Sequence, residues 1–209
     1  MLNSVLGKKI GMTQIFVSSG NVIPVTVVDV ANLFVTQVKA SEKNGYSALQ
    51  LGLLKKKYIG QPFSADWLKS KKKYFSFIRE VQMEESLLGS VEVGKEIKLE
   101  DINFEENNLV NVTGKSRGLG FQGVVKRWGF AGGPSAHGST FHRKPGSIGN
   151  VCSDGKVIKG KKLPGQTGNK RISVKNLKIV RIDKQNNCLF VKGAVPGKKN
   201  SVVMVSRQG

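Results

Sequence analysis

A long internal segment, residues 114–170, has a composition that cannot form a hydrophobic core of its own. It holds 14 of the chain's 25 glycines and 11 of its 34 Lys and Arg residues, but only one acid, Asp154. Glycine loses much conformational freedom on ordering and adds no apolar surface, so we expect an external partner to order this segment. In the free protein it should be disordered, and strong amide-exchange protection there would contradict this expectation.

The charge of the chain indicates that this partner is an anion. From residue 114 to residue 150 the sequence GKSRGLGFQGVVKRWGFAGGPSAHGSTFHRKPGSIGN interleaves cationic, aromatic and small residues, which suits contacts with phosphates and unpaired bases. The formal net charge is +20, and residues 80–106 carry nine acids against two lysines, so the rest of the chain is more basic still. Nucleic acid is the expected partner. On composition alone, residues 114–170 could also be a flexible basic linker.

The flanking segments supply the core and predict a mainly β fold. Apolar residues alternate with polar ones or form short β-branched blocks, which is typical of strands. We expect strands at residues 22–30, 33–40, 48–54, 96–99, 109–113, 171–183, 188–195 and 202–205. Turn formers at 183–187 predict a hairpin over 179–193. A short helix could follow Ser64, whose hydroxyl can cap residues 65–73.

These elements predict one domain, residues 1–209, with three parts. Strands from residues 1–40, 107–113 and 171–209 should close a β-barrel, residues 41–106 should form a lateral α+β insertion, and residues 114–170 a long extension. Because the N-terminal region lacks a signal core or presequence pattern, and because Cys152 and Cys188 are too few for a disulfide framework, we expect a cytoplasmic protein.

Two glycine patterns in the extension imitate nucleotide-binding motifs. Residues 118–123 match G-x-G-x-x-G, but we expect no helix after them, and no acid follows until Asp154 to hold a ribose. The kinase form of this loop lacks its catalytic partners. Residues 155–161 match the phosphate loop G-x-x-x-x-G-K, but Lys162 stands where Ser or Thr should hold magnesium. We therefore expect no nucleotide cofactor.

A metal or catalytic site is also unsupported. His137 and His142 would need Cys152 and Cys188 to complete a zinc site, and this spacing fits no rigid ligand face. The extension offers too few acid and base groups near one another for acid–base or nucleophilic catalysis. We expect no metal, no cofactor and no catalytic residue.

What remains is electrostatic binding. The cations that can approach phosphates are Lys115, Arg117, Lys126, Arg127, Arg143, Lys144, Lys156, Lys159, Lys161, Lys162, Lys170 and Arg171. Release of condensed counterions would make such binding strongly salt dependent. The aromatic side chains of Phe121, Trp128, Phe130 and Phe141 could stack on bases or pack against the barrel, and the residues alone leave both readings open.

Several collinear motifs resemble the bacterial type of large-subunit ribosomal protein three. They are LGKKIGMTQIF from residue 6, GFQGVVKRWGFAGGP from 120, HG at 137, HRKPGSIG from 142, VIKGKKLPGQ from 157 and VKGAVPG from 191. The match extends over essentially the whole chain, only loosely in residues 41–106. The resemblance implies a β-barrel of the kind shared by translation proteins, with an extension that enters rRNA and approaches the peptidyl transferase centre.

The resemblance also implies residues and partners. By motif match Lys8, Lys9, Trp128, His137 and His142 join the rRNA-binding set, and the extension tip is Gly146, Ser147, Ile148, Gly149, Asn150, Val151 and Cys152. The partners would be large-subunit rRNA near its 3′ end and neighbouring ribosomal proteins, with no membrane and no homo-oligomer. The chain would act early in assembly, in the large subunit, and without enzymatic activity. Some family members carry a methylated glutamine where this chain has Cys152, so that modification is not implied.

Two readings from other classes remain. A barrel enzyme or translation factor could bind RNA transiently, but a nucleotide-driven factor should carry an intact phosphate loop. A polybasic membrane-surface protein would bind anionic vesicles even after nuclease treatment, although the sequence has neither a spanning apolar run nor a long basic amphipathic helix.

Overall fold

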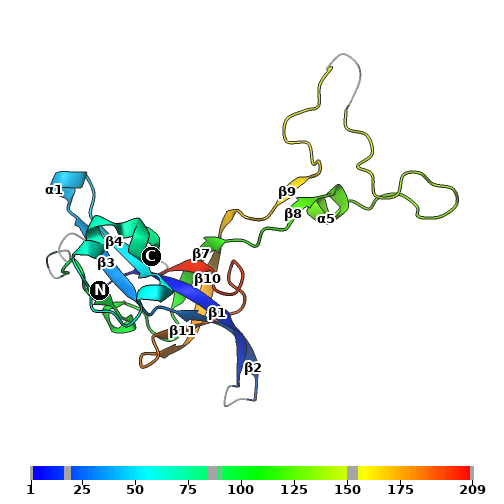
Figure 1. Cartoon of the computed structure of the whole chain (residues 1–209). Helices are drawn as coiled ribbons and strands as arrows, with labels where there is room; N and C mark the ends of the chain where they lie inside the picture. The colour runs from blue at the N-terminus through cyan, green and yellow to red at the C-terminus, as the bar shows by residue number, and fades with distance from the viewer. Residues whose placement is uncertain (1, 17–19, 84–88, 90, 150–154, 208–209) are drawn as a thin grey trace. The chain divides into compact units, whose positions relative to one another are not determined.

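The computed structural model describes residues 2–16, 20–83, 89, 91–149 and 155–207. It divides the chain into two compact units (Figure 1). The first, here called the barrel unit, comprises Met1–Ser116 and Arg171–Gly209. The second, here called the extension, is Arg117–Lys170.

Six strands of the barrel unit close a β-barrel in the order β1-β12-β7-β10-β11-β2. Their bounds are β1 Ser4–Phe16, β2 Val22–Asp29, β7 Leu109–Lys115, β10 Arg171–Asp183, β11 Cys188–Lys192 and β12 Val202–Arg207. All six pairings are antiparallel, and β1 pairs with both β12 and β2. Closure removes the exposed edge on which an open sheet could pair with other chains.

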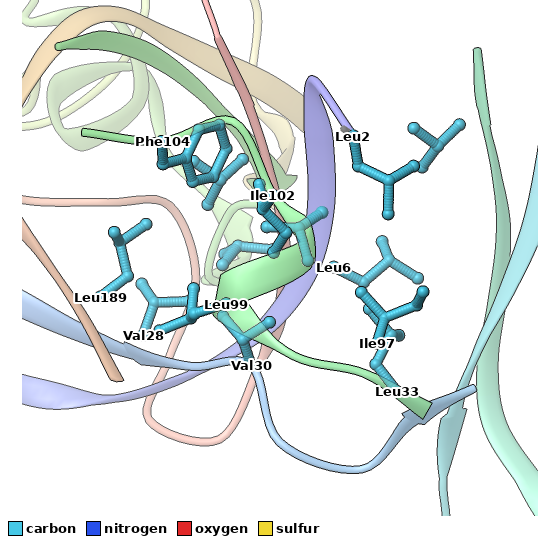
Figure 2. Close-up of a cluster of buried hydrophobic side chains, with 14 of the residues drawn as sticks. Leu2, Leu6, Val28, Val30, Leu33, Ile97, Leu99, Ile102, Phe104 and Leu189 are labelled. Atoms are coloured by element: carbon cyan, nitrogen blue, oxygen red, sulfur yellow. The ribbon is translucent and has the colours of Figure 1, made fainter. Parts of the chain in front are cut away.

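Alternating side chains fill the barrel. Val110 and Val112 of β7, and Leu189 and Val191 of β11, are fully buried, as a period of two requires for strands with one face inward. Each such residue contributes about 1.5–3 kcal/mol when fully buried. Figure 2 shows the same cluster reaching the segment after β6 (Glu96–Ile97), where Leu99, Ile102 and Phe104 lie beside Leu6 and Val28.

A second, four-stranded sheet in the order β5-β4-β3-β6 belongs to the same unit. Its strands are β3 Leu33–Lys39, β4 Ala48–Leu54, β5 Phe75–Gln82 and β6 Glu96–Ile97. Short helices connect them: α1 Ser41–Asn44, α2 Asp66–Lys69, α3 Lys71–Tyr74 and two 3₁₀ turns, Lys56–Tyr58 and Leu99–Asp101. Trp67 of α2 is buried with Leu54 and Phe75 in a small core of its own.

The eight predicted strands are all present, with ends shifted by up to three residues. The predicted hairpin is β10–β11, where Ile179 pairs with Val191 and Asp183 with Cys188. The Asp183 carboxylate accepts hydrogen bonds from the backbone and side-chain N–H groups of Asn186, at 3.2 and 2.8 Å, and so fixes the turn. Strands β1 and β5, and two short strands in the extension, were missed.

Three expectations need correction. The strand at 33–40 lies in the second sheet and not in the barrel, because Asn32 takes a positive φ of 61° and redirects the chain after β2. The helix at 65–73 is broken at Ser70 into α2 and α3, and the Ser64 hydroxyl makes only a 3.4 Å bond to the Asp66 amide. The barrel keeps Gly114 and Lys115, which lie in β7.

The distal half of the β1–β2 hairpin carries no charge. No Lys, Arg, Asp or Glu occurs from Ile10 to Val28, although 23% of the whole chain is charged. Phe16 is paired with Val22 across the strands, and the two are 70% and 49% exposed; Met12 is 52% exposed. This uncharged ribbon thus exposes several apolar side chains on a strongly basic protein.

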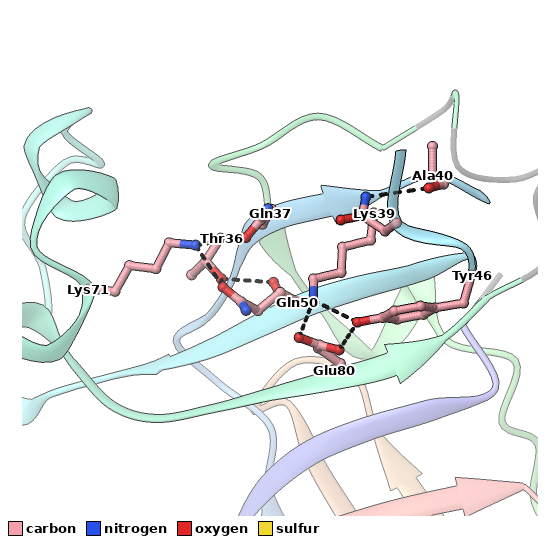
Figure 3. Close-up of polar contacts among 9 residues, drawn as sticks. Thr36, Gln37, Lys39, Ala40, Tyr46, Gln50, Lys71 and Glu80 are labelled. Carbon is pink, nitrogen blue, oxygen red and sulfur yellow. Dashed lines mark hydrogen bonds and ion pairs between the residues drawn. The ribbon is translucent and has the colours of Figure 1, made fainter. Parts of the chain in front are cut away.

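A polar cluster links β3, β4 and β5 (Figure 3). The Lys39 ammonium lies 2.6 Å from the Glu80 carboxylate and donates to the Tyr46 hydroxyl at 2.7 Å; that hydroxyl donates to Glu80 at 2.7 Å. The hydrogen bond from Lys39 is the main reason that the pKa of Glu80 lies below its ordinary value of 4.5, and Tyr46 adds to the effect.

We expect Glu80→Gln to remove a pH-dependent part of the stability. Because the folded pKa of Glu80 is depressed, its contribution is fully present above about pH 4.5 and is lost as the pH falls through the folded pKa. The free energy of unfolding of the wild type should therefore exceed that of the variant at pH 6, by a small amount because water screens the pair. Urea titrations from pH 6 to pH 3 should show this difference closing below pH 4.5; a constant difference would contradict it.

Candidate nucleic-acid interface

The extension starts with a short ribbon and a single turn of helix. Strand β8 Gly120–Gln122 pairs antiparallel with β9 Gly165–Thr167, and helix α5 Val124–Trp128 follows Gly123. We expected no helix after the residue 118–123 motif, and that expectation was wrong. Sequence reasoning missed α5 because glycines flank both ends of its five residues, and Gly129 ends it with a φ of 74°.

Backbone approaches backbone where the two arms of the extension meet. Gly168 has a φ of 72°, and a Cβ atom there would overlap the carbonyl oxygen of Arg117. The next amide, that of Asn169, donates to the same oxygen at 3.3 Å. Only glycine permits this approach, so the glycine content of the arms has a local structural reason.

Arg127 and Trp128 hold the returning arm through one carbonyl group. The Arg127 guanidinium (Nη1) donates to the Leu163 oxygen at 2.6 Å, and the Trp128 indole (Nε1) donates to it at 2.9 Å. The Arg127 guanidinium also lies 4.9 Å from the Trp128 ring centroid, and the Lys162 ammonium 5.9 Å from it. Trp128 nevertheless stays 43% exposed, so its ring can both brace the extension and meet a ligand.

We expect Arg127→Lys to weaken RNA binding without changing its salt dependence. Lysine keeps the charge but lacks the planar fork that bonds Leu163 while lying over Trp128. Losing about 0.5–1.5 kcal/mol of bracing should lower the affinity for an RNA probe roughly 2- to 10-fold. The neighbouring exposed Lys126→Gln is the control: in filter-binding titrations it should reduce the salt slope by about 0.7–0.9. If Arg127→Lys changed the salt slope as much as Lys126→Gln does, the bracing role would be contradicted.

A glycine-lined loop packs around Phe141. The Gly133 amide donates to the His142 carbonyl at 2.6 Å, and a Cβ on Gly132 would lie 2.7 Å from the same oxygen. A Cβ on Gly133 would overlap the Phe141 ring. His142 contributes its backbone to this closure at a φ of 45°, while its imidazole is exposed.

The structure places most of the predicted rRNA-binding residues on the surface. Within the extension the exposed ones are Arg117, Lys126, Trp128, His137, His142, Arg143, Lys144, Lys156, Lys159, Lys161, Lys162 and Lys170; Arg127 is half-buried. Lys115 and Arg171, exposed and paired across β7 and β10, belong to the barrel unit. The described residues of the extension include no Asp or Glu, so their formal charge is positive throughout.

The predicted tip is only partly described. Gly146, Ser147, Ile148 and Gly149 are exposed, and the Ser147 hydroxyl donates to the Gly149 carbonyl at 3.1 Å. Asn150, Val151 and Cys152 lie outside the described residues.

Comparison with known proteins covers both units. The family model described as ribosomal protein L3 matches residues 90–188. Large ribosomal subunit protein uL3 of Pseudothermotoga lettingae is 44% identical over 98% of this chain and 96% of its own. The uL3 proteins of Geobacter sulfurreducens (44% identical; 98% and 97% covered) and Dehalococcoides mccartyi (41%; 100% of both) are similar.

The chain belongs to the ribosomal protein L3 (uL3) family. Because the uL3 alignments span nearly all of both chains, they include the barrel strands and the whole extension. No helix in the described part of the chain is long and apolar enough to cross a membrane.

Within this uL3 chain the two lysines of the N-terminal motif differ in their surroundings. The Lys9 ammonium donates to the carbonyls of Val195 and Gly197, at 2.9 and 3.3 Å, and thereby ties β1 to the loop before β12. Sequence reasoning placed Lys9 only on rRNA, because its carbonyl partners lie more than 180 residues away. Lys8 is half-buried and lines a hollow of about 450 Å³ together with Lys55 and Lys56.

The two glycine patterns that resemble nucleotide-binding motifs, and the residues considered for a metal site, do not form such sites in the described part of the chain. Gly118, Gly120 and Gly123 lie around the β8 strand, and the five-residue α5 is too short to present a pyrophosphate site. Residues 155–162 form exposed irregular backbone, and the described residues that follow, 163–170, contain no helix of the kind that a phosphate loop needs. Among the described residues no three His, Cys, Asp or Glu side chains come together as metal ligands.

Proposed function

We propose that this chain is a structural constituent of the large ribosomal subunit and binds large-subunit rRNA directly. The observation that carries the proposal is the exposed cationic extension without a described carboxylate, in a chain that aligns with uL3 over nearly its whole length. Exposed cations on slim, glycine-rich backbone suit rRNA, where phosphates crowd together and little room is left for side chains.

We further propose where on the rRNA the chain binds and at which stage of assembly. The chain binds near the 3′ end of the rRNA early in assembly, and its tip, residues 146–152, approaches the peptidyl transferase centre. There it supports the catalytic RNA and contributes no catalytic side chain. It needs no cofactor, remains a single copy among neighbouring ribosomal proteins, and works in the cytoplasm.

Sedimentation of tagged protein from a lysate tests the main proposal. On sucrose gradients at physiological and at high salt, the protein should stay with the large subunit in both, as many simultaneous contacts require. Release at high salt alone would indicate a peripheral basic factor. Absence from ribosomal fractions throughout would overturn the proposal.

The position of the tip can be tested through Cys152. A Cys188→Ser variant leaves Cys152 as the single thiol, since the chain has two cysteines. An iron chelate attached there, in assembled large subunits, should cleave rRNA around the peptidyl transferase centre by hydroxyl radicals. The double variant without either thiol is the control, and cleavage confined to distant rRNA would contradict the proposed position.

A further inference from the structure

The barrel unit contains a hollow of about 500 Å³, lined by residues of β5 and of the barrel strands β7, β10 and β12. Its volume falls within the roughly 300–1,000 Å³ of pockets that enclose small ligands. Phe77, Val202 and Met204, all half-buried, supply an apolar wall. A hollow of this size, with one apolar wall, suits a flat group such as the face of a nucleobase.

Three cations stand around this apolar wall: Arg79, Lys115 and Arg171. All are exposed, and none takes part in the three ion pairs found among the described residues. The one acid of the lining, Glu80, is already bonded to Lys39 and Tyr46. The hollow therefore presents net positive charge that the described residues leave unmatched.

The chemistry at the wall favours a nucleobase over an acidic peptide. The Arg79 guanidinium lies 5.6 Å from the Phe77 ring centroid and offers a planar, weakly hydrated cation on which a base can stack. Thr113 is one of the lining residues, and its hydroxyl is hydrogen-bonded to that of Ser173 at 2.6 Å, a polar pair beside the apolar wall. Carboxylates of a peptide would match the charge but not the flat apolar wall.

We propose that this hollow receives one unstacked nucleotide of large-subunit rRNA. The base lies against Phe77 and Met204, and the flanking phosphates meet Lys115, Arg171 and Arg79. The proposal rests on the proposed rRNA-binding function and adds to it a defined nucleotide pocket on the barrel. Lys115 lies just before the extension in the chain and Arg171 just after it. The pocket would therefore anchor RNA where the chain leaves the barrel unit and where it returns.

Chemical probing of rRNA in purified large subunits tests the pocket. Two variants perturb it by different chemistry: Arg79→Gln with Arg171→Gln removes cations, and Met204→Trp fills the apolar wall without changing charge. In both, the same single-stranded nucleotide should gain reactivity toward base-modifying reagents by several-fold. The matched control is Lys175→Gln with Lys178→Gln, which removes two exposed cations of β10 outside the hollow and should leave that nucleotide protected.

The possible outcomes separate this inference from the function on which it rests. If wild-type protein is absent from large subunits, the proposed function fails. If all variants sediment with the subunit and rRNA reactivity is unchanged, the nucleotide pocket alone is overturned, as it also is if the control exposes the same nucleotide. If the double variant is not incorporated, the single Arg79→Gln variant, which keeps Lys115 and Arg171, replaces it. The same nucleotide should then gain reactivity toward base-modifying reagents.

Discussion

Replacing residues 116–170 with Asn-Gly should give a folded barrel that binds rRNA about a hundredfold more weakly. Strands β7 and β10 are antiparallel neighbours, and Lys115 is paired with Arg171, so a two-residue turn can join them. The replacement removes ten Lys and Arg residues and one Asp. Losing as few as two charge-assisted hydrogen bonds, at ~1.5 kcal/mol each, accounts for a hundredfold loss.

Filter binding to a large-subunit rRNA fragment at several salt concentrations would measure this effect. The salt slope should also decrease by about 0.7–0.9 for each phosphate contact removed. A chain whose extension is replaced by Gly and Ser of equal length separates lost charge from lost length. Circular dichroism and cooperative thermal unfolding should show that the shortened barrel is folded; unchanged affinity and slope would exclude the extension as the main interface.

Leu6→Ala should destabilise the barrel by about 2–5 kcal/mol. Leu6 lies on β1, is fully buried in the main hydrophobic cluster, and its truncation leaves a cavity that packed strands cannot close. This is a large part of the roughly 5–15 kcal/mol that stabilises a typical domain. In urea titrations the unfolding midpoint should fall accordingly.

The control for this variant lies on the same strand. Met12 is 52% exposed, so Met12→Ala should change the free energy of unfolding by less than about 0.5 kcal/mol. If the two variants were equally stable, the inward placement of Leu6 would be wrong.

The sequence predicted the strands best where alternation is local. Arg171–Asp183 and Cys188–Lys192 carry both alternation and a turn between them, so their hairpin could be predicted and is confirmed. Strand β1 was missed because Gly7, Lys8, Lys9 and Gly11 interrupt its apolar pattern. In the fold two of these residues have a structural role: a Cβ on Gly7 would overlap Val28, and Lys9 ties β1 to a distant loop.

The division of strands between barrel and sheet could not be predicted from local pattern. Strands β2 and β3 are similar apolar runs separated by three residues, and the positive φ of Asn32 sends them to different sheets. For the candidate interface, composition located the cations, since phosphate binding needs charge more than geometry. Composition could not reveal that Arg127 and Trp128 share the Leu163 carbonyl, because that contact spans more than 30 residues.

The uncharged β1–β2 hairpin bears on how a cell must handle this protein before assembly. With Met12, Phe16 and Val22 exposed, an orphan copy presents a ribbon without the charged residues that usually prevent strands from sticking to one another. The same copy carries a formal net charge of +20, and we expect this charge to attract nucleic acids without regard to sequence. We therefore expect copies made in excess of their binding partner to aggregate more readily than copies in which the ribbon and the cations are covered.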